Sequence, residues 1–99
     1  MHEQRHEIEP TGRFIVRASF IITGQGTCAS GFTADGVVRR GDRLEWLDGE
    51  THRQATCTGV STITERPMQH PPTIGLIVAD ASPDQFAEGT EIAAFHPNA

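Results

Sequence analysis

The chain has 99 residues, a formal net charge of −5, 36% hydrophobic residues and 21% charged residues. This length fits one domain, and the composition is that of a globular chain and not of a disordered one. All eight basic residues are arginines, and the net acidity argues against strong non-specific binding to phosphate backbones, which requires a basic face.

The beginning of the chain is polar and shows no apolar periodicity. We therefore expect a flexible arm over residues 1–12, a barrel domain over 13–96 and a tail over 97–99. The polar start predicts no signal peptide, and the longest apolar run is about six residues, too short for a spanning helix. With only two cysteines, a disulfide framework is not expected, so these features favour the cytoplasm and exclude a membrane partner.

Two strands joined by a glycine-rich turn are predicted first. Apolar residues alternate along residues 14–23, which predicts a strand that keeps one face apolar from Phe14 to Ile22. The Gly24-Gln25-Gly26 run is interpreted as a turn and not as a phosphate cradle, because no helix follows it and the chain has no lysine. A second strand is expected over 27–33, where Gly31 indicates a bulge or a close approach of two backbones.

The next segment reverses direction twice. Asp35-Gly36 is a turn signal. Val37 and Val38 are then expected to resume the strand, before Arg40-Gly41-Asp42 turns the chain into a strand over 44–47.

A hairpin and a proline-rich loop follow. Asp48-Gly49 is a strong signal for a hairpin turn. A long strand is expected over 52–63, and Gly59 indicates that it bends. The three prolines of 65–72 exclude a central strand, and a fifth strand is expected over 73–79.

The end of the chain predicts a helical turn and a last strand. Ser82 as N-cap, Pro83 at the first position and Gln85 three residues after the cap are typical of a helix start. Phe86 can anchor a short turn near 82–88. A last strand over 90–95 completes an all-β chain, for which we predict a small closed six-stranded barrel.

The glycine pattern resembles that of a known domain family, the β-barrel second domain of translational GTPases, and most closely that of elongation factor Tu. The resemblance covers residues 14–94, and the runs 56–60, 74–78 and 82–89 also match. Its motif residues are Phe20, Ile22, Gly24, Gly26, Thr27, Gly31, Gly36-Val37-Val38 and Gly41-Asp42.

The resemblance implies a translation-linked origin and altered RNA contacts. In elongation factor Tu this barrel helps to bind the aminoacylated 3′ end of transfer RNA. The family's arginine between the two glycines is Gln25 here, and its charged residues after the Thr-Gly-Val run correspond to Ser61 and Thr64. The sequence shows no GTP-binding domain, so we expect no bound nucleotide, no GTP hydrolysis and no cofactor for this chain alone.

Besides Gln25, Ser61 and Thr64, the candidate binding residues fall in two loops. Arg39, Arg40 and Arg43 surround a turn, where they fit either contacts to phosphate or an acidic protein face, or a solvated turn. Met68 and His70 lie in the proline-rich loop, and long loops of this kind often carry function.

Other residues fit either a structural role or a functional one. Cys57 fits either a nucleophile or a small core residue. His52, His70 and His96 are too scattered in sequence to indicate a metal site. Trp46 fits a contact residue or a residue of the barrel wall.

These observations leave three hypotheses for function. The first is a non-catalytic binding module whose partner is a protein or a second copy of the chain. The second is a binder of the transfer RNA acceptor end. The third is a small enzyme that uses Cys57 or a histidine, for which the sequence offers no catalytic constellation.

Overall fold

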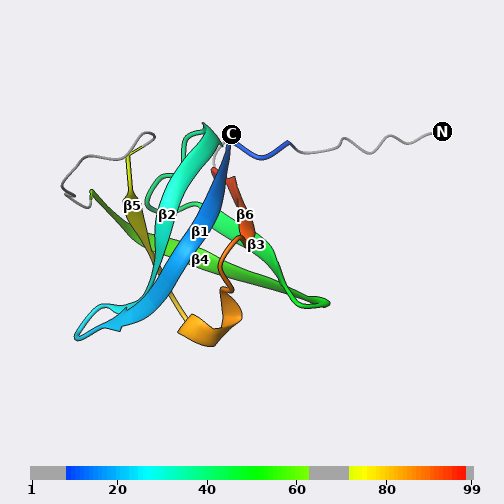
Figure 1. Ribbon diagram of the computed structural model, residues 1–99. Helices are drawn as coiled ribbons and strands as arrows, with labels where there is room; N and C mark the ends of the chain where they lie inside the picture. Colours follow the sequence, from blue (N-terminus) through cyan, green and yellow to red (C-terminus); the bar gives the residue numbers. More distant parts are fainter. Residues whose placement is uncertain (1–8, 63–71, 98–99) are drawn as a thin grey trace.

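The computed structural model describes residues 9–62 and 72–97. The strands close into a barrel in the order β1-β2-β5-β4-β3-β6, and all neighbouring pairs are antiparallel (Figure 1). This confirms the predicted all-β closed barrel of six strands with one short helical turn. The elements are β1 (Gly12–Ile22), β2 (Gly26–Gly36), β3 (Arg43–Asp48), β4 (Thr51–Thr62), β5 (Ile74–Val78), the 3₁₀ turn η1 (Pro83–Gln85) and β6 (Glu91–Phe95).

Bulges bend the long strands so that the barrel can close. Gly31 pairs with Val16, and the β1–β2 register then skips Arg17. A Cβ atom on Gly31 would lie only 1.9 Å from the Ile15 carbonyl oxygen, so the two backbones meet there at a distance that only glycine permits. Another register shift lies beside Gly59 in β4. The predicted close approach at Gly31 and the predicted bend at Gly59 are thus confirmed.

The prediction that Phe14 to Ile22 alternate regularly onto one face of the first strand is wrong. Phe14 and Val16 are buried, whereas Phe20 is 42% exposed. The bulge at Arg17 adds a residue to β1 and shifts the alternation by one position. Ser19 therefore takes the inward direction and donates a hydrogen bond to the Pro83 carbonyl oxygen at 2.8 Å.

The predicted continuation of a strand through Val37 and Val38 is also wrong. β2 runs without a break to Gly36, where a φ of 67° turns the chain out of the sheet. The Val37 N–H then donates to the Thr11 carbonyl oxygen at 2.9 Å. Val38 is only 7% exposed because it packs against the core.

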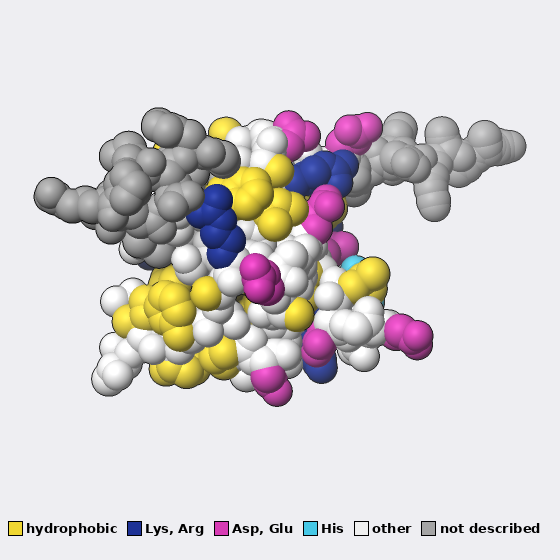
Figure 2. All heavy atoms as spheres, in the orientation of Figure 1, with side chains coloured by type: hydrophobic (Ala, Val, Ile, Leu, Met, Phe, Trp, Pro, Cys, Tyr) yellow, Lys and Arg dark blue, Asp and Glu magenta, His cyan; other side chains and the backbone are white. Residues whose placement is uncertain are grey.

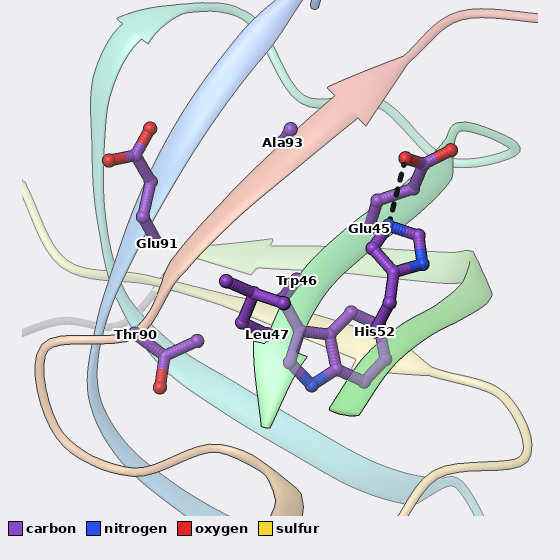
Figure 3. A pocket seen from close by; sticks show the side chains of 7 residues that line it. All are labelled: Glu45, Trp46, Leu47, His52, Thr90, Glu91 and Ala93. Atoms are coloured by element: carbon purple, nitrogen blue, oxygen red, sulfur yellow. Dashed lines mark ion pairs between the residues drawn. The ribbon is translucent and has the colours of Figure 1, made fainter. Parts of the chain in front are cut away.

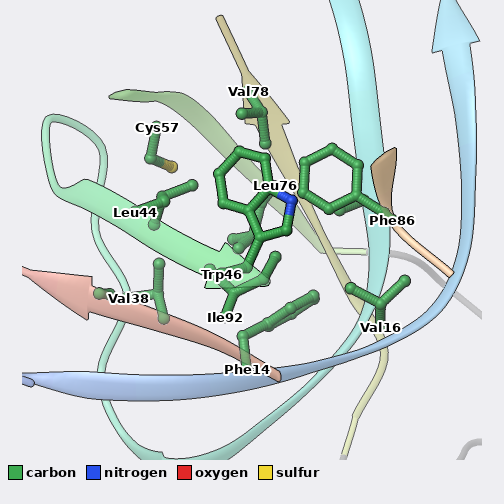
Figure 4. Packing of buried hydrophobic residues seen from close by; sticks show 12 residues of the cluster. Phe14, Val16, Val38, Leu44, Trp46, Cys57, Leu76, Val78, Phe86 and Ile92 are labelled. Atoms are coloured by element: carbon green, nitrogen blue, oxygen red, sulfur yellow. The ribbon is translucent and has the colours of Figure 1, made fainter. Parts of the chain in front are cut away.

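The core fills the interior of the barrel (Figure 4). Trp46 packs against Phe86 with ring centroids 4.5 Å apart, and its indole N–H donates to the Gln85 carbonyl oxygen at 3.1 Å. This confirms Trp46 as a residue of the barrel wall and Phe86 as the anchor of η1. The buried cluster comprises Phe14, Val16, Ala29, Val38, Leu44, Trp46, Cys57, Leu76, Val78, Phe86, Ile92 and Ala94.

The predicted hairpin turn, the glycine-rich turn and the start of the helical turn are present, whereas Asp35-Gly36 lies at the end of β2. Asp48 pairs with Thr51 across the β3–β4 hairpin, and Gly49 has the positive φ that such a turn needs. The Gln25 N–H donates to the Ile22 carbonyl oxygen at 2.9 Å in the β1–β2 turn. At η1 the Gln85 side chain accepts a hydrogen bond from the Ser82 N–H at 3.4 Å.

Candidate functional site

The segment between β2 and β3, residues 37–42, is held to the barrel by its backbone. We call it the arginine loop. The Gly41 N–H donates to the Cys57 carbonyl oxygen at 2.7 Å, and the Cys57 N–H donates to the Asp42 carbonyl oxygen at 2.9 Å. With the Val37–Thr11 bond, the loop is fixed to both β4 and the start of β1.

A buried carboxylate fixes the same loop from within. Asp42 is fully buried, and its Oδ2 accepts a hydrogen bond from the Arg39 N–H at 2.8 Å. Its Oδ1 lies 2.8 Å from Nδ1 of His96, just after β6. The His96 N–H in turn donates to the Thr11 hydroxyl at 3.2 Å. Both oxygens of this buried carboxylate are therefore satisfied, which ties the loop to the end of the chain's last strand.

Two of the predicted arginines differ from all the others in the described residues. Arg39 and Arg40 are exposed, and neither side chain has a hydrogen bond, an ion pair or a ring contact within residues 9–62 and 72–97. Arg43, by contrast, bonds Glu45 at 2.8 Å and lies over the Phe95 ring. The remaining three are also paired: Arg13 with Glu91, Arg17 with Thr73 and Phe32, and Arg53 with Asp48.

Among the other predicted site residues, the two that the structure describes, Gln25 and Ser61, lie apart. Gln25 is exposed in the β1–β2 turn, next to the end of β2 that pairs with Val78. Ser61 is exposed near the end of β4 and pairs with Gly75, toward the opposite end of β5. Thr64, Met68 and His70 lie outside the described residues.

A hollow of about 410 Å³ opens on the outer face between β3, β4 and β6 (Figure 3). Glu45 and His52 form one side of it, with Glu45 Oε1 and His52 Nε2 3.4 Å apart. Leu47, which is 60% exposed, lies between this pair and Glu91. The hollow is lined by Glu45, Trp46, Leu47, His52, Thr90, Glu91 and Ala93.

Sequence reasoning missed this hollow. It forms because β3 pairs with β6, which sets Glu45 opposite Ala93 although 48 positions separate them in the chain. The only local signal was the pattern of β3 itself, in which a glutamate and a leucine alternate with the buried Leu44 and Trp46.

The two thiols sit in surroundings that favour their protonated form. Burial raises the pKa of Cys28. Burial and the nearby Asp42 charge raise the pKa of Cys57, against an opposing backbone hydrogen bond at Gly59. Cys57 is fully buried in the core cluster, which fits a small packing residue and not a reactive nucleophile.

The histidines of the described chain are engaged separately. His52 contacts Glu45, and His96 contacts Asp42 at the far end of β6. Within residues 9–62 and 72–97, no group of three or more His, Cys, Asp or Glu side chains is arranged to hold a metal ion.

The chain matches no model of a known protein family and no curated protein sequence. In the described part of the chain, no helix has the length and apolarity needed to cross a membrane. The site is therefore interpreted from its own geometry.

Proposed function

We propose that this chain is a non-catalytic binding module, with a barrel of the translational-GTPase second-domain type, and that its arginine loop binds an acidic segment of a partner protein. The observation that carries the proposal is the pair of guanidinium groups of Arg39 and Arg40, which have no partner within residues 9–62 and 72–97 and lie on a loop whose backbone is fixed.

A fixed loop lowers the cost of binding. Hydrogen bonds from Val37, Arg39 and Gly41 hold the backbone before any partner arrives, so less conformational entropy is lost on association. Guanidinium groups form bidentate pairs with carboxylates. Val37, which is 50% exposed, adds an apolar contact beside them.

The charge distribution favours a protein over a nucleic acid. The net charge is −5, and Figure 2 shows acidic side chains spread among the few basic ones on one face, without a continuous basic stripe. A phosphate backbone is bound by many cations at once. Two isolated arginines suit a short acidic segment better.

The test is a pull-down from a lysate of the cells that make the protein, with three forms of the protein as bait. The forms are the wild type, the Arg39→Gln/Arg40→Gln double variant and Arg53→Gln, a control whose arginine is already paired with Asp48. We expect a protein with an acidic segment to be retained by the wild type and the control, and lost by the double variant. Equal retention by all three, or no partner on any, would contradict the proposal.

Transfer RNA binding is the second candidate, favoured by the family resemblance and by the same two free arginines. It predicts an affinity for transfer RNA that falls steeply with salt and is lost in the double variant. The protein-binding proposal predicts no such affinity even at low salt.

A further inference from the structure

We propose that the hollow between β3, β4 and β6 is a second binding site, separate from the arginine loop, and that it takes a lysine side chain presented by a partner protein. This inference rests on the proposed protein-binding function only for the source of the lysine. The site itself is argued from its lining and its charges.

The size and floor of the hollow suit an aliphatic chain. A volume of about 410 Å³ lies within the range of small-ligand sites, though the hollow is open to solvent. Leu47 and Ala93 offer an apolar surface, and Leu47 is 60% exposed, so a covering group would remove apolar area from water. The four-carbon stem of lysine packs on surfaces of this kind while its charged head stays polar.

Two carboxylates at the hollow can offer acceptor oxygens to a cation. Glu91 and Glu45 line it from two sides of Leu47, and no arginine is among its lining residues (Figure 3). Arg13 bonds Oε2 of Glu91 at 2.9 Å, and Arg43 bonds Oε2 of Glu45 at 2.8 Å. Each arginine therefore engages one carboxylate oxygen and leaves Oε1 of the same group available.

The pattern of free oxygens distinguishes lysine from arginine. Glu91 Oε1 has no partner in the described residues, and Glu45 Oε1 has only the 3.4 Å contact with His52. Single oxygens on two sides do not match the planar fork of a guanidinium, which prefers both oxygens of one carboxylate. A compact ammonium needs only a single acceptor oxygen, so Glu91 Oε1 or Glu45 Oε1 suits a lysine head better than a guanidinium, and the geometry points to lysine.

The test uses two small probes that differ only in the terminal ammonium group. Nα-acetyl-lysine methylamide is titrated into the ¹⁵N-labelled full chain, and Nα-acetyl-norleucine methylamide serves as the uncharged comparison. We expect the lysine probe to shift the amide signals of Leu47, Glu91 and Ala93, with a dissociation constant of about 1–10 mM for a single side chain. The norleucine probe should bind at least about tenfold more weakly.

Matched variants separate binding from folding. Glu91→Gln removes the charge of a half-exposed residue without disturbing the core, and should weaken the lysine probe about fivefold or more. Glu88→Gln, which changes an exposed carboxylate outside the lining, should leave the affinity unchanged. Equal binding of both probes, unchanged affinity in Glu91→Gln, or no shift of these three amides would overturn the inference.

The outcome can be read independently of the proposed function. If the lysine probe fails while the Arg39→Gln/Arg40→Gln variant still loses its partner, only the hollow proposal is wrong. If the lysine probe binds as expected but no partner is captured, the hollow stands and the arginine-loop proposal is wrong.

Discussion

Gly31 shows how one residue controls the closure of this barrel. Its missing side chain lets β2 pass β1 at a distance where an added Cβ would lie 1.9 Å from the Ile15 carbonyl oxygen. Since that neighbour is backbone, it cannot move aside without breaking the β1–β2 ladder. A substitution here therefore acts on the sheet and not on one contact.

We expect Gly31→Ala to lower the free energy of unfolding by about 3 kcal/mol or more, because backbone must shift to accommodate the methyl group. Gly24→Ala is the matched control, since an added Cβ there meets nothing within 4 Å and only the positive φ of 83° is strained. That variant should lose about 1 kcal/mol. Denaturant unfolding of both proteins checks the prediction. Equal losses of unfolding free energy in the two variants would show that the close approach of the backbones at Gly31 does not determine the cost.

The two cysteines give the chain an unusually simple alkaline titration. The sequence contains no tyrosine and no lysine, so above the ordinary thiol pKa of 9.0 only cysteines change charge before the arginines do. Burial raises the pKa of both thiols in the folded state. The folded chain therefore keeps protons that the unfolded chain releases, so stability is full below pH 9 and falls as pH rises through the folded pKa values.

We expect the free energy of unfolding to fall by up to about 1.4 kcal/mol per pH unit for each thiol in this range. A Cys28→Ala/Cys57→Ala double variant should be less stable than the wild type at pH 9. Its free energy of unfolding should then fall little further between pH 9 and about pH 10.5. Denaturant melts across this range measure both slopes. The prediction is wrong if the wild type and the variant decline in parallel.

At the scale of elements, sequence periodicity predicted the strands but not where their faces invert. The turn signals at Asp48-Gly49 and Ser82-Pro83 are local, because they depend on a few adjacent residues, and both were confirmed. The outward position of Phe20 depends on a bulge opposite Gly31, which is a property of the β1–β2 pairing. Alternation within one strand carries no information on that pairing.

The arginine loop shows the same limit. The sequence placed Arg39, Arg40 and Arg43 around a turn, which is correct, but it gave no reason to separate them. Their difference arises because Arg43 opens β3 beside Glu45 and Phe95, whereas the other two precede the strand.

Asp42 is expected to be the residue that keeps this loop in place. Replacing it by alanine removes the acceptor of the Arg39 N–H and the partner of His96. We expect Asp42→Ala to cost about 2–4 kcal/mol of unfolding free energy and to speed amide exchange at Arg39 and Gly41. Asp35→Ala, whose carboxylate is exposed and 3.9 Å from Arg13, should cost less than about 1 kcal/mol.

If amide exchange in the loop is unchanged in Asp42→Ala, the backbone bonds to Cys57 and Thr11 suffice and the buried carboxylate is not needed to fix the loop. The loss of stability would then reflect the buried His96 contact alone.

At the scale of the whole molecule, non-local pairing creates the features that matter for binding. The hollow exists because β6 closes the sheet between β1 and β3, and the arginine loop is fixed because it spans β4, β1 and the end of β6. The fold class followed from strand and turn signals spread along the chain. That Arg39 and Arg40 lack a partner in the described part of the chain, while the other arginines there are paired, follows only from three-dimensional neighbours.

The central claim is that Arg39 and Arg40 form the binding element of this barrel. The most direct test is the anisotropy of a fluorescein-labelled peptide of glutamate and valine residues at low salt, titrated with the wild type, the Arg39→Gln/Arg40→Gln variant and Arg53→Gln. We predict binding to the wild type that weakens with salt, a loss of about tenfold or more in the double variant, and little change in Arg53→Gln. Equal affinity for all three proteins, or a larger loss in Arg53→Gln than in the double variant, would contradict the claim.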